Sequence, residues 1–291
     1  MNLKFSEKQK LLLAWAFIFA FAGLFIFVNK LKHGRQNMIK NEALVTSEDT
    51  MPLAIPTTTT KSLHLPILMY HHIGDPPPVY NATRYDLTVS IKNFQEQVKW
   101  LKDNGYTSIS LADFYQSLKS KFVLPKKPII LSFDDGYGDA FLNAIPILKQ
   151  NGFTGTFAII TNYPGETSGT NFYASWQQII DAKEQGMEII CHTQNHFDAK
   201  NPKYTAEYMY QNYSGCQKDI VGHLGQAYPF LVYPYGHYTD TSIAQAKKVG
   251  FVFGITIHEG SFINLNDLMH IPRVRVHRDE SIETLAKMLQ K

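Results

Sequence analysis

The sequence predicts an α/β protein: a distorted (β/α) barrel of about seven strand-helix units, preceded by an N-terminal transmembrane helix. Three observations support this fold class. Residues 11–28 form an uncharged apolar run. From residue 64 onward, short β-rich runs alternate with amphipathic helical stretches, a pattern typical of a parallel sheet or barrel. Polar motifs directly follow two of these runs, at the strand ends where such folds collect their chemistry.

The apolar run at residues 11–28 is eighteen residues long and contains no charge, Asn or Gln. As a helix it spans roughly 27 Å, close to the ~30 Å hydrocarbon core of a bilayer. We therefore expect a transmembrane anchor after a short basic segment at residues 1–10. A cleavable signal peptide is the alternative, because residues 20–22 have the small-x-small form. Basic residues flank the run on both sides, so the charge rule leaves its orientation open.

Charge is unevenly distributed along the chain. Lys and Arg number 28 and Asp and Glu 25, a net charge of +3. Residues 1–40 contain seven Lys or Arg and one Glu, so the other 251 residues together carry −3. A body without a basic surplus argues against a nucleic-acid partner. With 44% hydrophobic and 18% charged residues, the chain can bury a core, which excludes whole-chain disorder.

Residues 29–63 separate the predicted anchor from the predicted barrel. They begin basic and then turn to Thr, Ser, Glu and Pro, with four consecutive Thr at residues 57–60. Such a segment has no apolar period and cannot bury enough surface to repay its ordering entropy. We expect a linker here, followed by one catalytic domain over residues 64–291.

Within that domain the helices have recognisable ends. Ser90 is predicted to cap a helix whose apolar residues follow at helical spacing, and Gly105 is predicted to end it. Gly152, Gly186 and Gly250 are predicted to end later helices, each just before a strand. The expected strands lie at residues 66–70, 106–110, 129–133, 153–160, 187–191, 230–233, 251–256 and 271–276.

The two cysteines, Cys191 and Cys216, have neither the spacing of a metal pair nor the number of a disulfide framework. An extracytoplasmic body could join them. Because Cys191 lies in an apolar stretch, we expect a buried free thiol instead.

A pair of carboxylates, Asp134 and Asp135, follows the apolar run at residues 129–133 directly, and Gly136 comes next. Two adjacent carboxylates at the end of a buried strand are costly to desolvate unless a cation or hydrogen bonds compensate. Because side chains alternate along a regular strand, both can serve one pocket only if the strand ends there. The alternative is an Asp-Asp-Gly surface turn.

A pair of histidines, His192 and His196, follows the apolar run at residues 187–191. Four residues apart on a helical turn, two imidazoles can face the same way and share one metal. With one carboxylate they would hold a divalent ion and leave positions open for water and substrate. The second carboxylate could then act as the base toward water whose pKa the ion has lowered to ~7.

The motifs Ser-Phe-Asp-Asp-Gly at residues 132–136 and His-Thr-x-x-His at residues 192–196 resemble those of the polysaccharide deacetylases, carbohydrate esterase family 4 or NodB-homology enzymes. The resemblance extends over most of residues 64–291. It implies a bound metal, usually Zn²⁺, with Asp134 as the catalytic base. It also implies three metal ligands, namely Asp135, His192 and His196.

The third family motif normally contains an Arg, but residues 232–236 read Val-Tyr-Pro-Tyr-Gly. This departure, together with Leu-Met-Tyr-His-His at residues 68–72, resembles the branch that contains the biofilm poly-N-acetylglucosamine deacetylases. In that branch a histidine near the front of the domain is the catalytic acid. The match implies that role for His71, with His72 as the alternative.

Two further residues complete the predicted site. Arg273, in the run Ile-Pro-Arg-Val-Arg, could supply the cation that the third motif lacks and keep Asp134 ionised. The alternative is a surface arginine. Tyr235 could direct its backbone N–H toward the oxyanion that forms when water attacks an acetamide.

These residues together predict a membrane-anchored, metal-dependent N-deacetylase acting on N-acetylglucosamine units of an extracellular polysaccharide. Its single span would place the N-terminus inside and the catalytic domain outside the cell. One alternative substrate is peptidoglycan or a small amide. A second alternative is a non-catalytic carbohydrate-binding protein on the same fold.

Overall fold

The computed structural model describes residues 62–76 and 80–290. The predicted anchor at residues 11–28 and the start of the domain's linker lie outside these residues. Within the described part of the chain, no helix combines the length and apolarity needed to cross a bilayer.

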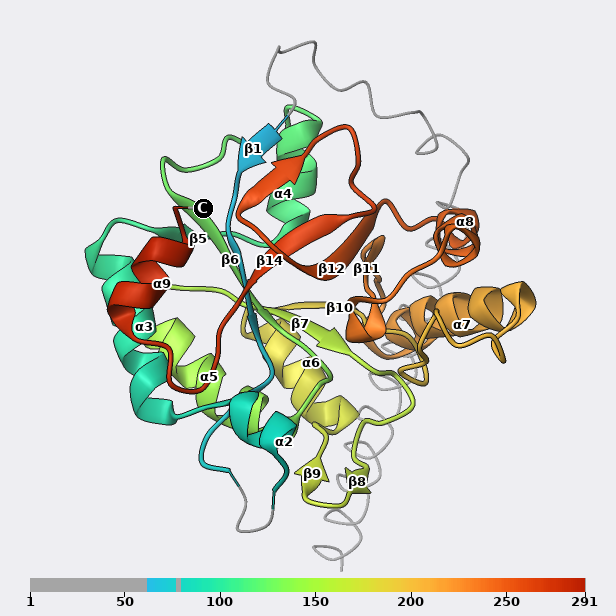
Figure 1. The fold of residues 1–291 in the computed structure, drawn as a ribbon, viewed down its shortest axis with the longest axis horizontal. Helices are drawn as coiled ribbons and strands as arrows, with labels where there is room; N and C mark the ends of the chain where they lie inside the picture. Colours follow the sequence, from blue (N-terminus) through green and yellow to red (C-terminus); the bar gives the residue numbers. More distant parts are fainter. Residues whose placement is uncertain (1–61, 77–79, 291) are drawn as a thin grey trace, which may run out of the picture. The chain divides into compact units, whose positions relative to one another are not determined.

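A closed barrel of seven parallel strands forms the centre of the domain (Figure 1). Each strand pairs with the next one of the barrel along the chain, and the last pairs with the first, which confirms the predicted (β/α) barrel. The strands, in order, are β2 (Ile67–Tyr70), β6 (Pro128–Phe133), β7 (Thr156–Ile159), β10 (Glu188–Cys191), β11 (Phe230–Val232), β12 (Phe253–Glu259) and β14 (Ile271–Arg275).

The eighth expected strand, at residues 106–110, is reduced to β5 (Thr107–Ser108) and lies outside the closed ring. It pairs only with the first two residues of β6, Pro128 and Ile129. From Ile130 onward β6 pairs with β2 instead, which closes the barrel. Short pairs lie outside the ring, namely β1 (Ser62–His64) with β13 (Phe262–Asn264), β3 (His72–Ile73) with β4 (Thr88–Val89), and β8 (Thr167–Ser168) with β9 (Asn171–Phe172).

Helices surround the barrel, and their ends follow the sequence signals. The Ser90 side chain accepts a hydrogen bond from the Asn93 N–H, as expected of an N-cap. Gly152 and Gly250 end their helices with φ of +76° and +106°, a conformation that favours glycine. The helices are α2 (Ala82–Asp86), α3 (Ile91–Asp103), α4 (Leu111–Leu118), α5 (Gly138–Asn151), α6 (Trp176–Glu184), α7 (Ala206–Leu224), α8 (Asp240–Val249) and α9 (Ile282–Met288).

The amino end of the barrel is closed by α4. Glu188, at the start of β10, is buried and accepts hydrogen bonds from the N–H groups of Leu111 and Ala112 at 2.9 and 2.8 Å. The Thr156 hydroxyl, at the start of β7, donates to the same carboxylate at 2.7 Å. Because the first N–H groups of a helix have no partner within it, this carboxylate attaches α4 to the barrel. The carboxyl end of the barrel is left for the site.

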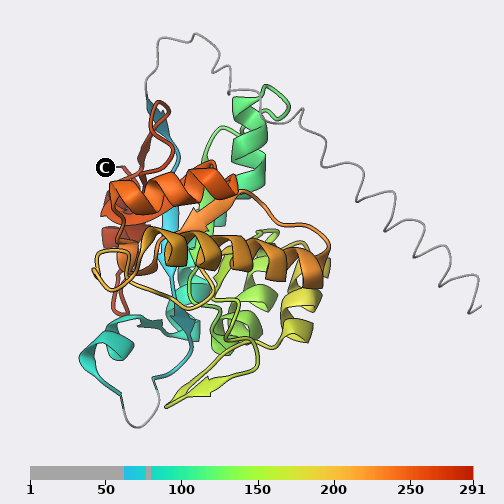
Figure 2. The same cartoon turned by 90° about the vertical axis from the view of Figure 1, so that its right-hand side faces the viewer.

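Helix α7 lies beside α8 on one flank of the barrel (Figure 2). It is joined to β10 by a disulfide between Cys191 and Cys216, whose Cα atoms are 6.0 Å apart. The expectation of a free thiol at Cys191 is therefore wrong. The apolar surroundings of Cys191 were correctly read as buried, but burial does not exclude a partner cysteine that a distant helix brings to it.

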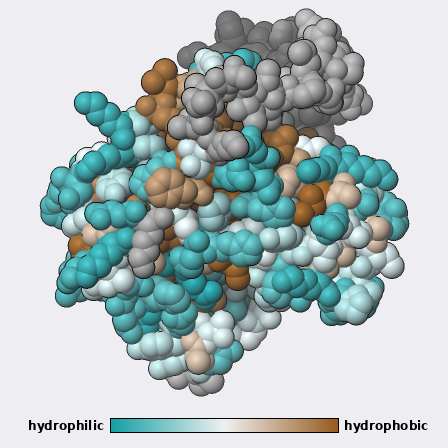
Figure 3. Space-filling model, turned by 45° about the horizontal axis from the view of Figure 1, so that its top comes forward, coloured by the Kyte–Doolittle hydropathy of each residue, from teal (hydrophilic) through white to brown (hydrophobic). Residues whose placement is uncertain are grey.

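The outer surface of the domain is mainly polar. On the face shown in Figure 3, hydrophilic side chains dominate outside the grey atoms, and apolar side chains form separate patches among them. The apolar residues instead line the strands and the inner faces of the helices.

Candidate metal and catalytic site

The predicted site residues meet at the carboxyl end of the barrel. Asp134 and Asp135 follow β6, and the segment with the two histidines follows β10. Tyr235 follows β11, while Arg273 lies within β14. His71 follows β2, so five of the seven barrel strands contribute residues to the site.

Asp135, His192 and His196 form a group that could hold a metal ion. The Nε2 atoms of His192 and His196 lie 3.1 and 3.3 Å from Oδ1 of Asp135. One ligand atom from each residue lies within 4.8 Å of the others. Oδ1 of Asp135 is buried but accepts no hydrogen bond from any described residue. A buried carboxylate oxygen without a donor, facing two imidazole nitrogens, fits the ligand set of a divalent cation.

The strand end turns both carboxylates toward the site. Asp135 and Gly136 have φ of +71° and +82°, so the chain leaves the extended conformation immediately after Asp134. The alternation of side chains therefore stops at Asp134. A left-handed conformation is unusual for Asp and occurs where the surrounding structure maintains it, often at functional sites.

The two histidines share a side of the site without the helical turn that their spacing suggested. Residues 192–196 form a loop, in which Thr193 and His196 have φ of +68° and +51°. The Thr193 hydroxyl accepts a hydrogen bond from the His196 N–H at 2.9 Å. The expected helical turn is wrong because the left-handed residues, not helical periodicity, bring the imidazoles together.

The protonation pattern of this group suits a ligand role. Nδ1 of His192 lies 2.8 Å from the Val232 carbonyl, which can accept a hydrogen bond only if Nδ1 is the protonated nitrogen. In the neutral ring, Nε2 then has its lone pair free and faces Asp135. Burial acts to raise the pKa of Asp135, but the His192 and His196 side chains beside it hold that pKa well below its ordinary value.

Asp134 is paired with Arg273. The guanidinium donates from Nη1 to Oδ1 at 2.8 Å and from Nη2 to Oδ2 at 2.7 Å. It also donates from Nε to the Thr256 carbonyl at 2.8 Å and from Nη1 to the Ser132 hydroxyl at 3.1 Å. Burial acts to raise the pKa of Asp134, but the Arg273 charge and hydrogen bonds lower it overall. Arg273 is only 1% exposed, so the alternative of a surface arginine is wrong.

The two adjacent histidines of residues 68–72 have different surroundings. His71 is half-buried, and the charges that act on it are those of Asp135, Asp134, Arg273 and Arg275. Burial lowers the pKa of His71, and the two carboxylates only partly offset this. His72 is buried, with Nδ1 2.9 Å from Asp139 and its ring stacked on Tyr137 at a centroid distance of 3.6 Å. The Asp134 and Asp135 charges thus act on His71, whereas the His72 ring is held by Asp139 and Tyr137.

Tyr235 lies beside the histidine loop. Its ring is 53% exposed, and the ring centroid is 4.6 Å from that of His196. Its φ is +58°. Its N–H donates to no backbone carbonyl among the described residues, so it is available to an acceptor in the site.

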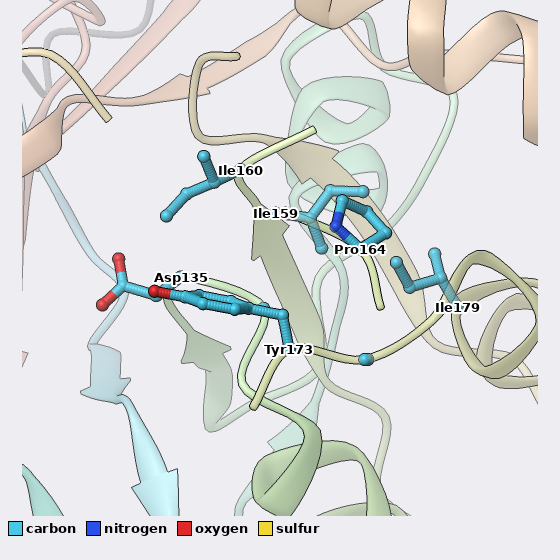
Figure 4. Close-up of a pocket in the computed structure, with 8 residues that line it drawn as sticks. Asp135, Ile159, Ile160, Pro164, Tyr173 and Ile179 are labelled. Carbon is cyan, nitrogen blue, oxygen red and sulfur yellow. The ribbon is translucent and has the colours of Figure 1, made fainter. Parts of the chain in front are cut away.

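Tyr173 is a residue of the site that the sequence did not indicate. Its hydroxyl points toward the Asp135 carboxylate in a small, mostly apolar pocket (Figure 4). The ring stacks on Tyr137 at 5.2 Å. Tyr137 directly follows the Asp-Asp-Gly motif, so its position in the sequence places it near the site. Tyr173 follows the distant β8–β9 hairpin and belongs to no recognisable motif. The pocket is lined by Asp135, Gly136, Ile159, Ile160, Pro164, Tyr173, Ala174 and Ile179.

Comparisons with known proteins all point to the same family. A family model described as "Polysaccharide deacetylase" matches residues 122–254. The poly-beta-1,6-N-acetyl-D-glucosamine N-deacetylase of Staphylococcus epidermidis is 31% identical over 210 residues, which cover 69% of this chain and 71% of that protein. The putative polysaccharide deacetylase YxkH of Bacillus subtilis is 28% identical over 218 residues, which cover 75% and 73%.

Solved structures show the same fold. The Streptococcus pyogenes deacetylase PplD in complex with acetate matches with a TM-score of 0.69 and 27% identity, covering 79% of this chain and 99% of that one. The putative polysaccharide deacetylase BA0330 from Bacillus anthracis matches with a TM-score of 0.67 and 28% identity, covering 78% and 69%.

Proposed function

The chain belongs to the polysaccharide deacetylase family, and from this premise we propose that it removes acetyl groups from N-acetylglucosamine units of an extracellular poly-N-acetylglucosamine. One observation carries the proposal: an ionised, arginine-paired Asp134 lies directly beside the Asp135–His192–His196 group. A base next to a site for a cation is an arrangement that can hydrolyse an amide with metal-activated water. Binding of a carbohydrate without reaction would require neither.

Asp135, His192 and His196 would hold the metal. Two imidazole nitrogens and one carboxylate oxygen form a ligand set that Zn²⁺ accepts, with positions left for water and substrate. When bound, the ion would polarise the acetyl carbonyl and lower the pKa of the attacking water. The hydrogen bond from His192 Nδ1 to Val232 would keep the coordinating nitrogen aimed at the site.

Asp134 would take the proton from the attacking water. A general base must be ionised at the working pH, and Arg273 provides for this by lowering the pKa of Asp134. The two hydrogen bonds also fix the plane of the carboxylate. Arg273 is thus proposed as a positioning residue that acts through Asp134.

His71 would donate a proton to the departing sugar amine. An amine is a poor leaving group unless it is protonated, so the site needs an acid as well as a base. The lowered pKa of His71 makes its imidazolium a stronger acid. The Tyr235 N–H would donate a hydrogen bond to the oxyanion formed on attack.

The experiment that tests this function is acetate release from defined oligomers. Purified protein would be incubated with β-1,6-linked and β-1,4-linked N-acetylglucosamine oligomers, and with peptidoglycan. We expect release from the β-1,6-linked substrate and none from an Asp134→Ala variant that still binds metal. Release from peptidoglycan alone would move the proposal to the wall polymer. No release by metal-loaded wild type from any substrate would favour a carbohydrate-binding protein.

We further propose that the domain lies outside the cytoplasm, attached by the predicted span at residues 11–28. The polymer substrate is extracellular, so the active site must face it. The Cys191–Cys216 disulfide supports this location, because disulfides persist in oxidising compartments and are rare in the cytosol. A reporter fused after Lys291 tests it: activity of a reporter that functions only in the cytoplasm would refute the location.

A further inference from the structure

The loop that carries both candidate histidine ligands is attached covalently to α7. Cys191 is the last residue of β10 and immediately precedes His192, and its disulfide bond joins it to Cys216 of α7. Both cysteines are fully buried, so the link lies inside the packing between α7 and the barrel. Figures 1 and 2 show α7 alongside this part of the barrel.

Polar side chains of α7 on either side of Cys216 hydrogen-bond to the same loop. Asn212 Oδ1 accepts a hydrogen bond from the Gln194 N–H at 2.8 Å. Asp219 Oδ2 accepts one from Gln194 Nε2 at 2.8 Å and another from the Thr161 hydroxyl at 2.6 Å. Residues 212, 216 and 219 are four and three apart, so all three attachments come from one face of α7.

The Gln194 side chain lies close against the backbone of α7 at Gly215. A Cβ at Gly215 would lie 2.1 Å from Oε1 of Gln194. A side chain there would displace the Gln194 amide from the position in which it donates to Asp219. The Gln194 amide therefore lies beside Gly215 of α7, where it reaches Asp219.

The loop needs such attachment because its own backbone does not favour the conformation it has. Thr193 and His196 are left-handed, and neither is glycine. Residues in this region persist only where the surrounding structure maintains them. The adjacent segment supplies two backbone hydrogen bonds, from the Thr161 and Asn162 N–H groups to the Thr193 and Gln194 carbonyls. Further support comes from α7.

We propose that the Cys191–Cys216 disulfide, Asn212 and Asp219 are positioning residues that preorganise the histidine loop for metal binding. The inference rests on the proposed metal-dependent function. Without these attachments the left-handed loop relaxes, and the imidazole nitrogens leave their places beside Asp135. The affinity for the metal then falls further than it does in a variant that loses stability elsewhere on α7. The site is consequently loaded best where the disulfide has formed.

The test compares Zn²⁺ affinity across matched variants of the full chain. Each protein is stripped with a chelator, and its Zn²⁺ dissociation constant is measured by competition with a chromophoric chelator. We expect Cys191→Ala/Cys216→Ala and Asp219→Ala each to weaken binding about 10-fold, the size typical of losing an outer partner of a metal ligand. Leu224→Ala is the control, because Leu224 is buried on α7 but lies beyond the loop attachments.

A second readout separates ligand geometry from stability. The visible absorption of the Co²⁺-loaded protein reports the ligand arrangement, and we expect it to change in the Cys and Asp219 variants but not in Leu224→Ala. Unchanged Zn²⁺ affinity and unchanged Co²⁺ spectra in folded Cys and Asp219 variants would overturn the proposal. Asp219→Ala, which removes the acceptor of both hydrogen bonds, keeps the test decisive if the double cysteine variant fails to fold.

The two proposals fail in different ways. If wild type binds Zn²⁺ but releases no acetate, the deacetylase function is refuted and the affinity comparison still decides the role of α7. If wild type releases acetate and the variants bind Zn²⁺ normally, only the positioning role is refuted. If wild type binds no Zn²⁺, both are refuted.

Discussion

Arg273 meets Asp134 through both ends of its guanidinium, although 139 positions separate them in the sequence. The barrel makes this possible, because β14 pairs with β2 and β2 pairs with β6. Arg273 thus reaches across the inside of the barrel to the end of β6 and is fully buried there. The cation missing from the third motif of the chain is supplied by the last strand.

We expect Arg273→Lys to lower kcat/KM and to move the acid limb of its pH profile toward higher pH. Lysine retains the charge but loses the planar, two-point hydrogen bonding. Burial raises the pKa of Asp134 and Arg273 lowers it, so a weaker partner lets that pKa rise. The base is then ionised only at higher pH. A shift of one pH unit would correspond to about 1.4 kcal/mol of lost interaction.

The pH profile of Arg275→Lys is the matched control for this effect. Arg275 lies two residues along the same strand, is partly exposed, and is 3.5 Å from Asp86 instead of Asp134. Its substitution should leave the acid limb in place. An unchanged acid limb in Arg273→Lys would contradict the positioning role.

His71→Gln and His72→Gln are expected to have opposite effects. His71 is the proposed general acid and is subject to the charges of Asp134 and Asp135, so its loss should lower kcat by about 10²-fold or more, with little loss of stability. His72 is buried against Asp139 and Tyr137, so its loss should lower the unfolding temperature and change kcat little. Acetate release and thermal unfolding of both variants measure this. The reverse result would assign the acid to His72.

The general plan of the barrel could be predicted from the sequence because its signals are local. Strands such as β6 are mainly apolar runs. Helices begin and end at capping residues such as Ser90 and Gly152, which can be recognised in the sequence. The expected strand at residues 106–110 contracted to two residues, because β6 uses its pairing capacity to close the ring with β2. Ring closure is a property of the whole sheet and has no local signal.

The site was partly predictable for the same reason. The structure brings Asp135 and His192 together because Asp135 lies just beyond the end of β6, His192 directly follows β10, and strand ends of a parallel barrel converge. The loop geometry of His196 could not be predicted, because the left-handed Thr193 lies in a loop that makes contacts with distant segments, among them Thr161 and Asn212. The Cys191–Cys216 bond likewise depends on where a helix lies relative to a strand.

Zn²⁺ is expected to raise the unfolding temperature of chelator-treated wild type and not that of His192→Ala. A ligand that binds only the folded state stabilises it by RT ln(1 + [L]/Kd), about 2.7 kcal/mol at 100 times Kd. His192 supplies one of three candidate ligands, and without it Oδ1 of Asp135 faces a single imidazole. Thermal unfolding with and without Zn²⁺ measures the difference. An equal shift in both proteins would place metal binding elsewhere.

The attachment of α4 to the barrel makes stability depend on pH through Glu188. Burial raises the pKa of Glu188 from 4.5 to about 7, although its hydrogen bonds to Thr156, Leu111 and Ala112 act in the opposite direction. Between these pH values the folded protein holds a proton that the unfolded chain has released. Stability from this group is therefore fully present below about pH 4.5 and is lost as pH rises through 7.

Glu188→Gln removes this titration. The free energy of unfolding of wild type minus that of Glu188→Gln should fall by about 2 kcal/mol between pH 5 and pH 8. Urea unfolding at the two pH values measures it. Glu184→Gln, at the exposed end of α6, is the control and should show no comparable change. A difference that stays constant or grows with pH would mean that the Glu188 carboxylate is ionised throughout this range. The three donors at the start of α4 and on Thr156 would then outweigh the cost of burying its charge.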